Sequence, residues 1–115
     1  MSELHGLSVR WSLRDATAGV EQRLRDYVVG TSLARFTGMP GLAFKTWRMV
    51  PGEWFEGTYV FAGAAPRDEF LSGFRQDAPT SPVSTLVGCP PELMEPFEVV
   101  AVAAGGAGFS ATGSS

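Results

Sequence analysis

The chain has 115 residues, of which 44% are hydrophobic and 18% charged, and its formal net charge at pH 7 is −3. This length supports one hydrophobic core, the composition excludes a disordered chain, and the acidic balance argues against a general nucleic-acid binder. The longest apolar run, residues 99–104, is too short to span a bilayer, and the first residues lack the basic and apolar regions of a secretory signal, so we expect a cytoplasmic protein.

Two amphipathic patterns open the chain. Apolar residues alternate with polar ones over residues 7–13, which predicts a strand with one apolar face. Asp15 is then a candidate N-cap for a helix whose apolar stripe recurs at i+4, i+7 and i+8 from Val20. The helix should end before Gly38, because glycine followed by Pro40 is a stop signal.

The middle of the chain predicts a β-hairpin. Two stretches rich in aromatic and β-branched residues flank a turn dipeptide: residues 42–50, residues 54–62 and, between them, Pro51-Gly52. If the dipeptide supplies both central residues of the turn, Phe44 lies opposite Tyr59. A loop of odd length would instead bring Tyr59 beside Lys45, because a one-residue slip moves every side chain to the other face of the sheet.

The second half of the chain is less regular. A helix is predicted over residues 66–76, because proline is favoured in the first turn of a helix. Four prolines make residues 76–91 mostly irregular, with a short extended piece at residues 85–87. Residues 97–103 predict the last strand, and the Gly/Ser/Ala-rich residues 105–115 predict a flexible tail.

The predicted order of elements is βαββαβ, an α+β plan of the ferredoxin-like type, with a four-stranded antiparallel sheet and two helices on one face. Residues 1–104 form this single domain. The one cysteine, Cys89, excludes an intramolecular disulfide, and the one histidine, His5, excludes a histidine-rich metal site. Because no glycine-rich dinucleotide loop follows the first strand, we expect a protein without cofactor or metal.

Two helices can cover only one face of this sheet, and the predicted register places aromatic residues on the other. Lys45, Trp47 and Met49 share that face with Trp54 and Thr58 of the neighbouring strand. Two tryptophans and a methionine are costly as a solvated surface, so the expected cover is a second copy of the sheet in a two-fold homodimer. The stacked sheets would enclose a small cavity in each half, in which a small molecule could bind.

The opposite face of the hairpin carries Leu42, Phe44 and Phe61 and is expected to form the core under the helices. Side chains two apart on a strand share a face, so Lys45 and Trp47 must lie together. Burial of an unpaired lysine under the helices would cost several kcal/mol, whereas each apolar side chain gains about 1.5–3 kcal/mol there. This difference predicts that Lys45 and Trp47 line the cavity at the dimer interface.

A sequence pattern extends over residues 40–47 and 57–61: Pro-Gly-Leu precedes an aromatic residue, a lysine and a tryptophan, and a glycine then precedes a tyrosine and a phenylalanine. Two later segments go with it, the turn at residues 88–91 and the closing strand at residues 97–103. With this pattern the chain resembles the YdhR-type monooxygenases of the dimeric α+β barrel superfamily, which also contains the antibiotic-biosynthesis monooxygenases. The resemblance extends over residues 7–104, although Glu56-Gly57 stands where the family has two glycines.

The resemblance implies a homodimeric barrel that oxygenates a small aromatic or enolisable substrate without metal or flavin. Haem-degrading members of the superfamily use a histidine on the second helix as the haem ligand. Residues 67–76, the corresponding helix here, contain no histidine, so haem is not expected.

Cofactor-free oxygenation requires a deprotonated substrate, a cation or donor beside its anion, and the exclusion of water. Lys45 could be the cation, Trp47 a flat wall for an aromatic ligand, and Tyr59 a donor to bound oxygen. Each has a structural alternative: a lysine paired with Glu56, a tryptophan packed in an interface, and a core tyrosine under the helices. Arg10 could bind a carboxylate or phenolate, or be a solvated strand residue. The candidate substrate-binding residues are Arg10, Trp47, Met49, Trp54 and Thr58.

With the resemblance, the leading hypothesis is a cofactor-independent monooxygenase that acts on a small aromatic or polyketide-like molecule in the cavity between the sheet and its dimer partner. Two alternatives remain open: a non-catalytic ligand-binding or accessory dimer, and a barrel isomerase or cyclase that uses the cavity without oxygen. The fold alone does not separate them.

Overall fold

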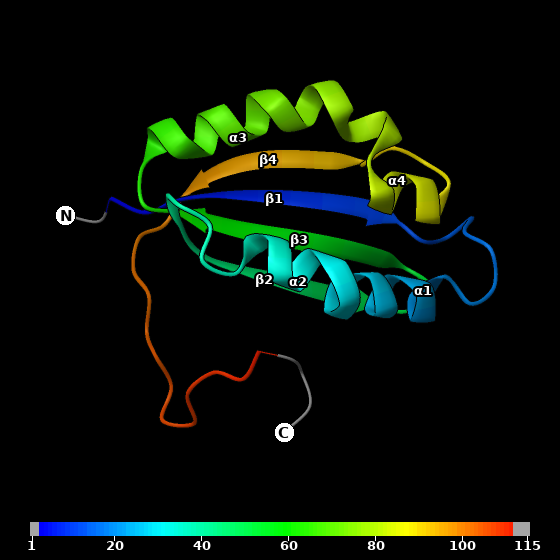
Figure 1. The fold of residues 1–115 in the computed structure, drawn as a ribbon, viewed down its shortest axis with the longest axis horizontal. Coiled ribbons are helices and arrows are strands. Elements are labelled where there is room, and N and C mark those ends of the chain that lie inside the picture. The colour runs from blue at the N-terminus through cyan, green and yellow to red at the C-terminus, as the bar shows by residue number, and fades with distance from the viewer. Residues whose placement is uncertain (1–2, 112–115) are drawn as a thin grey trace.

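The computed structural model describes residues 3–111 and shows one antiparallel sheet with its helices on one side (Figure 1). Both ends of the chain, including residues 112–115 of the predicted tail, lie outside the described residues. In chain order the elements are β1 (His5–Ser12), α1 (Val20–Tyr27), the π-helix η1 (Val28–Ser32), α2 (Leu33–Phe36), β2 (Leu42–Val50), β3 (Trp54–Phe61), α3 (Ala64–Asp77), the 3-10 helix η2 (Ala78–Thr80), α4 (Pro82–Val87) and β4 (Leu93–Glu98).

The four strands pair in the order β2-β3-β1-β4, and every pair is antiparallel. The hairpin strands therefore lie at one end of the sheet, and β1 separates β3 from the last strand. Figure 1 shows the helices on one face of the sheet and the other face open. This arrangement confirms the predicted α+β, ferredoxin-like fold. Within residues 3–111, no helix is long and apolar enough to cross a membrane.

The first helical segment covers residues 20–36, and its amphipathic stripe behaves as predicted. Val20 and Leu24 are buried, and the segment ends with α2, before the glycine and proline of the stop signal. The predicted cap is wrong, however. The helix begins after Gly19 rather than Asp15, and Gly19 has a φ of 85°, in the left-handed region that glycine adopts without steric cost.

The proline-rich connection between α3 and β4 is helical, so the prediction of an irregular segment is wrong. Pro82 is the first residue of α4, a position where the N–H that proline lacks would be unpaired in any case. Ser81 caps this helix by accepting a hydrogen bond from the backbone N–H of Ser84, and Gly88 ends it with a φ of 91°. Residues 85–87 therefore lie in a helix and not in an extended piece.

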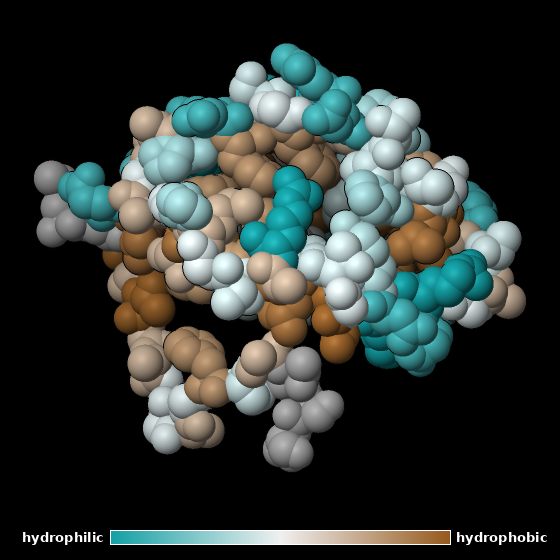
Figure 2. Space-filling model, in the orientation of Figure 1, coloured by the Kyte–Doolittle hydropathy of each residue, from teal (hydrophilic) through white to brown (hydrophobic). Residues whose placement is uncertain are grey.

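The last strand lies earlier in the sequence than residues 97–103. β4 pairs with β1 from Leu93 to Glu98, and Glu98 lies opposite His5, the first residue of β1. Because β1 begins there, the ladder ends there, and residues 99–111 extend away from the sheet (Figure 1). Figure 2 shows apolar side chains along the margin of the body that faces this segment.

The hairpin has a three-residue turn, so the register with two central turn residues is wrong. Val50 lies opposite Trp54, and the N–H of Glu53 donates to the carbonyl of Val50 at 2.9 Å. Lys45 is therefore opposite Tyr59, which is the arrangement expected for a loop of odd length.

A bulge in β2 determines which side chains face the helices. The register shifts between Leu42 and Phe44, so that Leu42 lies on the same side as Lys45. Phe44 points to the open face and is 41% exposed, which makes its predicted burial under the helices wrong. The observed register instead packs Trp47 and Met49 against the core. The free energy gained by their burial offsets the cost of burying Lys45 on the same side.

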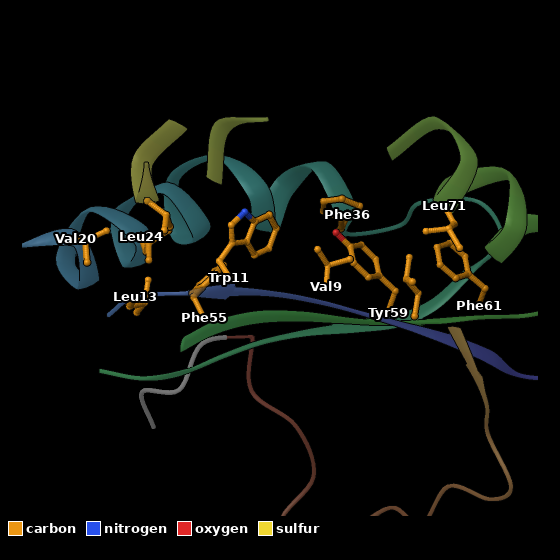
Figure 3. Close-up of a cluster of buried hydrophobic side chains, with 12 residues drawn as sticks. Val9, Trp11, Leu13, Val20, Leu24, Phe36, Phe55, Tyr59, Phe61 and Leu71 are labelled. Carbon is orange, nitrogen blue, oxygen red and sulfur yellow. The ribbon is translucent and has the colours of Figure 1, made fainter. Parts of the chain in front are cut away.

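The core lies between the helices and the sheet, as Figure 3 shows. Buried side chains of β1, β3 and the helices form most of it: Leu7, Val9, Trp11, Leu24, Phe36, Phe55, Tyr59, Phe61 and Leu71. The side chain of Tyr59 rises from the sheet toward Phe36 of α2. The indole N–H of Trp11 donates to the buried Ser84 hydroxyl at 2.9 Å and ties β1 to α4.

Candidate functional site

Two adjoining pockets lie between the helices and the sheet. The inner pocket has a volume of about 50 Å³, and its wall includes Lys45, Trp47 and Tyr59. The outer pocket, of about 600 Å³, is lined by α2 and α3, and the two pockets share Arg35 and Phe70. The predicted place of the site is therefore wrong. The pocket that contains Lys45 is covered by the chain's own helices and does not lie on the face left for a dimer partner.

Three aromatic rings surround the side-chain nitrogen of Lys45. Its Nζ lies 3.6 Å from the ring centroid of Phe36, 4.1 Å from that of Tyr59 and 4.5 Å from that of Trp47. Nζ also donates a hydrogen bond to Tyr59 Oη at 3.0 Å. No carboxylate within residues 3–111 forms a salt bridge with Lys45, so the predicted alternative of a pair with Glu56 is wrong. A cage of ring faces and one phenol stands in place of a counter-ion.

Burial and a second cation change the titration of this amine. Burial removes water from the ammonium form and, together with the nearby Arg35 guanidinium, lowers the pKa of Lys45 to about 6. Burial also raises the pKa of Tyr59, although Arg35 opposes this shift. At neutral pH the site therefore holds a mostly uncharged amine beside a phenol that keeps its proton.

The amino-acid composition points to this site, although the pattern of strands does not. Lys45 is the only lysine in the chain, and every other residue counted with it as Lys or Arg is an arginine. Arginine stays protonated in proteins, whereas lysine loses its proton readily when buried. The chain thus places its one lysine amine in the aromatic cage.

Gly57 makes room for this lysine. It lies opposite Trp47 in the hairpin, and the side chain of Lys45 passes over it. A Cβ atom at position 57 would be 3.3 Å from Lys45 Cε and 3.6 Å from the Tyr59 ring. The glycine therefore serves close packing of the cage.

The sequence pattern did not single out Arg35, Phe36 and Phe70, which α2 and α3 contribute. Phe36 is 5% exposed, and its ring centroid lies 5.6 Å from that of Tyr59 and 6.1 Å from that of Phe70. Helical spacing identifies the apolar stripe of each helix, but it does not show which strand residues that stripe meets.

Several predicted substrate-binding residues lie on the open face of the sheet, away from both pockets. Glu56, which is 1% exposed, accepts hydrogen bonds from Arg48 at 2.6 Å, Arg10 at 3.0 Å and the Thr58 hydroxyl at 3.2 Å. The Arg10 guanidinium also lies 3.9 Å from the ring centroid of Trp54. These side chains satisfy one another in a polar cluster and do not reach the cage.

The predicted site residues thus lie in three places, of which the polar cluster on the open face is one. Lys45, Trp47 and Tyr59 meet at the inner pocket. Met49 lies opposite Phe55 and packs against the core without lining either pocket. Among the residues that the structure describes, no group of three or more His, Cys, Asp or Glu side chains is arranged to hold a metal ion.

Solved structures share the fold. NE2512, a protein of unknown function from Nitrosomonas europaea, superimposes with a TM-score of 0.62 at 23% identity, over 87% of this chain and 92% of its own. A proposed antibiotic biosynthesis monooxygenase from Chloroflexus aurantiacus J-10-fl gives a TM-score of 0.52 at 17% identity, over 87% and 96%. No family model and no curated protein matches the sequence. At these identities the likeness establishes the common fold.

Proposed function

We propose that the protein is a cofactor-independent monooxygenase of a small aromatic or polyketide-like substrate, with Lys45 as its general base. The observation that carries the proposal is the amine of Lys45, which lies in the wall of the inner pocket, ringed by aromatic faces and without a salt bridge among residues 3–111. A base that titrates near neutral pH removes acidic protons efficiently. The fold shared with a proposed antibiotic biosynthesis monooxygenase supports the same class of reaction by analogy.

The proposed reaction needs no external reductant. A substrate methylene group between activating groups loses a proton to the Lys45 amine, and the resulting carbanion transfers one electron to O₂. The substrate radical and superoxide combine, and the peroxide takes up the proton and loses water as the carbon becomes a carbonyl. One oxygen atom enters the product and the other leaves as water, so the substrate supplies all the electrons.

The other groups of the two pockets support this chemistry. Arg35 lines both pockets and can hold the substrate anion through its guanidinium. Trp47 and Phe36 line the inner pocket around the amine, and the adjoining outer pocket of about 600 Å³ has room for an aromatic ring. Tyr59 keeps its proton and can donate a hydrogen bond to the peroxide oxygen.

Isotope incorporation tests the proposal. The protein is incubated with 1,3-dicarbonyl compounds and with polyhydroxylated aromatics under ¹⁸O₂, and the products are analysed by mass spectrometry. We expect one labelled oxygen per product and a rate loss of about 10²-fold or more in both Lys45→Met and Lys45→Arg. Arg14→Gln changes an exposed arginine and should keep the full rate. Equal oxygenation by the wild type and both Lys45 variants would show that this amine is not the base.

The two alternative functions predict different results on the same compounds. An isomerase or cyclase would use the same base but stop at the carbanion, so it would exchange substrate hydrogen for deuterium without oxygen uptake. A binding protein would do neither. Parallel measurements of deuterium exchange and oxygen uptake therefore distinguish the three functions.

We also propose that the protein forms a homodimer through the open face of its sheet. Two of the residues first expected to need such cover, Trp47 and Met49, are packed under the chain's own helices. Support comes instead from Phe44, which is 41% exposed on this face, and from Val100 and Phe109 in the segment after β4, which are 91% and 92% exposed. A second copy of the sheet would remove such apolar groups from water.

A further inference from the structure

The caged lysine has the surroundings of a carbonyl-reactive amine as well as those of a base. We infer that Lys45 condenses reversibly with small aldehydes and 2-oxo acids to form an imine in the inner pocket. The inference rests on the same uncharged amine as the proposed oxygenation, but the reaction requires no oxygen. It would give the chain a covalent binding site for carbonyl compounds.

The cage supplies the reactive form of the amine and places ring faces beside the charge of the product. A carbonyl carbon is attacked by an amine that has a free electron pair, and burial of Lys45 supplies that form at neutral pH. The product, a protonated imine, is a cation at the position of Nζ. Phe36 and Tyr59 present their ring faces there at 3.6 and 4.1 Å, and ring faces attract cations.

The condensation balances without a further reagent. The Nζ electron pair forms a bond to the carbonyl carbon, the C=O π electrons move to oxygen, and a proton passes from nitrogen to that oxygen. The carbinolamine then loses its hydroxyl as water when the nitrogen electron pair forms the C=N bond. Tyr59 Oη, 3.0 Å from Nζ, can give a proton to the leaving hydroxyl and regain one from solvent. Nothing is oxidised or reduced, and water is the only by-product.

Size and charge indicate the class of carbonyl compound. The inner pocket measures about 50 Å³, less than two water molecules occupy in the liquid at about 30 Å³ each, so only a carbonyl compound of two or three carbons can reach Nζ, with its remaining atoms in the adjoining outer pocket. Arg35 lines the same pocket and forms no salt bridge within residues 3–111, so it can pair with a carboxylate next to the carbonyl. Glu69 and Asp77 of α3 line the outer pocket but not the inner one, and their negative charges disfavour larger anions there.

Reductive trapping tests the inference cleanly, because the chain offers few amines. The protein is incubated anaerobically with glyoxylate and sodium cyanoborohydride, and the adducts are located by mass spectrometry of proteolytic peptides. Lys45 and the terminal amine are the two candidate sites, so the terminal amine serves as an internal reference in every sample. We expect an adduct on Lys45 whose yield relative to the terminal adduct rises as the pH falls from about 8 to about 6, since an ordinary terminal amine has a pKa of about 7.7–8.0.

Two controls make the result decisive. Protein unfolded in urea should lose this preference, because its lysine regains an ordinary pKa of about 10.4. Arg35→Gln should reduce the yield with glyoxylate more than the yield with acetaldehyde, which lacks the carboxylate. Because Arg35 also lowers the pKa of Lys45, acetaldehyde measures the part of the loss that comes from the amine alone. An adduct confined to the terminal amine of the folded protein would overturn the inference. If Lys45 still titrates near 6 in that case, the proposed oxygenation stands alone, whereas titration near the ordinary lysine value removes the support for both.

Discussion

Lys45 lies directly over Gly57, so closely that a β-carbon at position 57 would stand 3.3 Å from its Cε and 3.7 Å from its Nζ. The two residues belong to neighbouring strands and are brought together by the three-residue turn of the hairpin. The position of the amine against the rings thus depends on the absence of a side chain on the strand beneath it.

Gly57→Ala should therefore move the amine. The added methyl group requires Lys45 to shift by a few tenths of an ångström against the rings around it. A cage loosened in this way admits water to the amine, and the pKa of Lys45 should rise from about 6. Selective ¹³C labelling of lysine gives one Cε signal in this chain, whose shift against pH reports the titration directly. Gly30→Ala is the matched control, since a Cβ there meets nothing within 4 Å, and it should leave the titration unchanged.

The lysine should also make stability depend on pH. Its pKa is about 6 in the folded chain, below the ordinary value, so the unfolded state binds more protons between these two values and the free energy of unfolding rises with pH there. The slope for one group is at most about 1.4 kcal/mol per pH unit. Lys45→Met should remove this slope and be the more stable protein at pH 7. Urea unfolding of both proteins at pH 6 to about 9 measures the difference; parallel curves would show that the amine is charged in the folded state.

The turn and the bulge explain why the site was only partly predictable from the sequence. Alternation and helical spacing are enough to predict the βαββαβ order of the main elements, although not α4, and to place Lys45 and Trp47 on one face of the sheet. The face itself depends on whether Glu53 belongs to the turn, because one residue more reverses every side chain. In either register several apolar side chains would face the core, so the apolar pattern does not decide between them. The bulge at Ala43 then returns Leu42 to the side of the sheet that faces the core.

Glu56→Gln should destabilise the protein by about 2–3 kcal/mol at pH 7, because it removes the charge that compensates Arg10 and Arg48. Burial alone would raise the pKa of Glu56, but the hydrogen bonds from Arg48 and Arg10 outweigh it and lower the pKa. The stabilisation is therefore present above the unfolded pKa of about 4.3 and is lost as the pH falls through the folded value. Thermal unfolding of both proteins at pH 7 and at about pH 3 should show a smaller difference at the lower pH.

Glu53→Gln provides the comparison for this experiment. Its carboxylate lies 3.8 Å from Arg14, and both side chains are more than half exposed. An exposed pair of this kind contributes little, so the stability should change by less than about 0.5 kcal/mol. Equal losses in the two variants would contradict the special role of the buried carboxylate.

The oligomeric state tests the proposed interface. Light scattering at micromolar concentration should give a dimer for the wild type and a monomer for Phe44→Asp, because the charge would be buried between two sheets. Val29→Asp is the matched control, since Val29 is 59% exposed but belongs to the helical side. A monomeric wild type, or a dimer that is lost equally in both variants, would contradict an interface on the open face.

The confinement of lysine to the cage has a practical consequence for proteolysis. A protease that cuts only after lysine has one target bond in this chain, between Lys45 and Thr46 in the middle of β2. That bond can enter a protease active site only after β2 has separated from β3. Each cut therefore requires one opening of the hairpin. The rate at which the two fragments appear would measure the local stability of the cage without any added label.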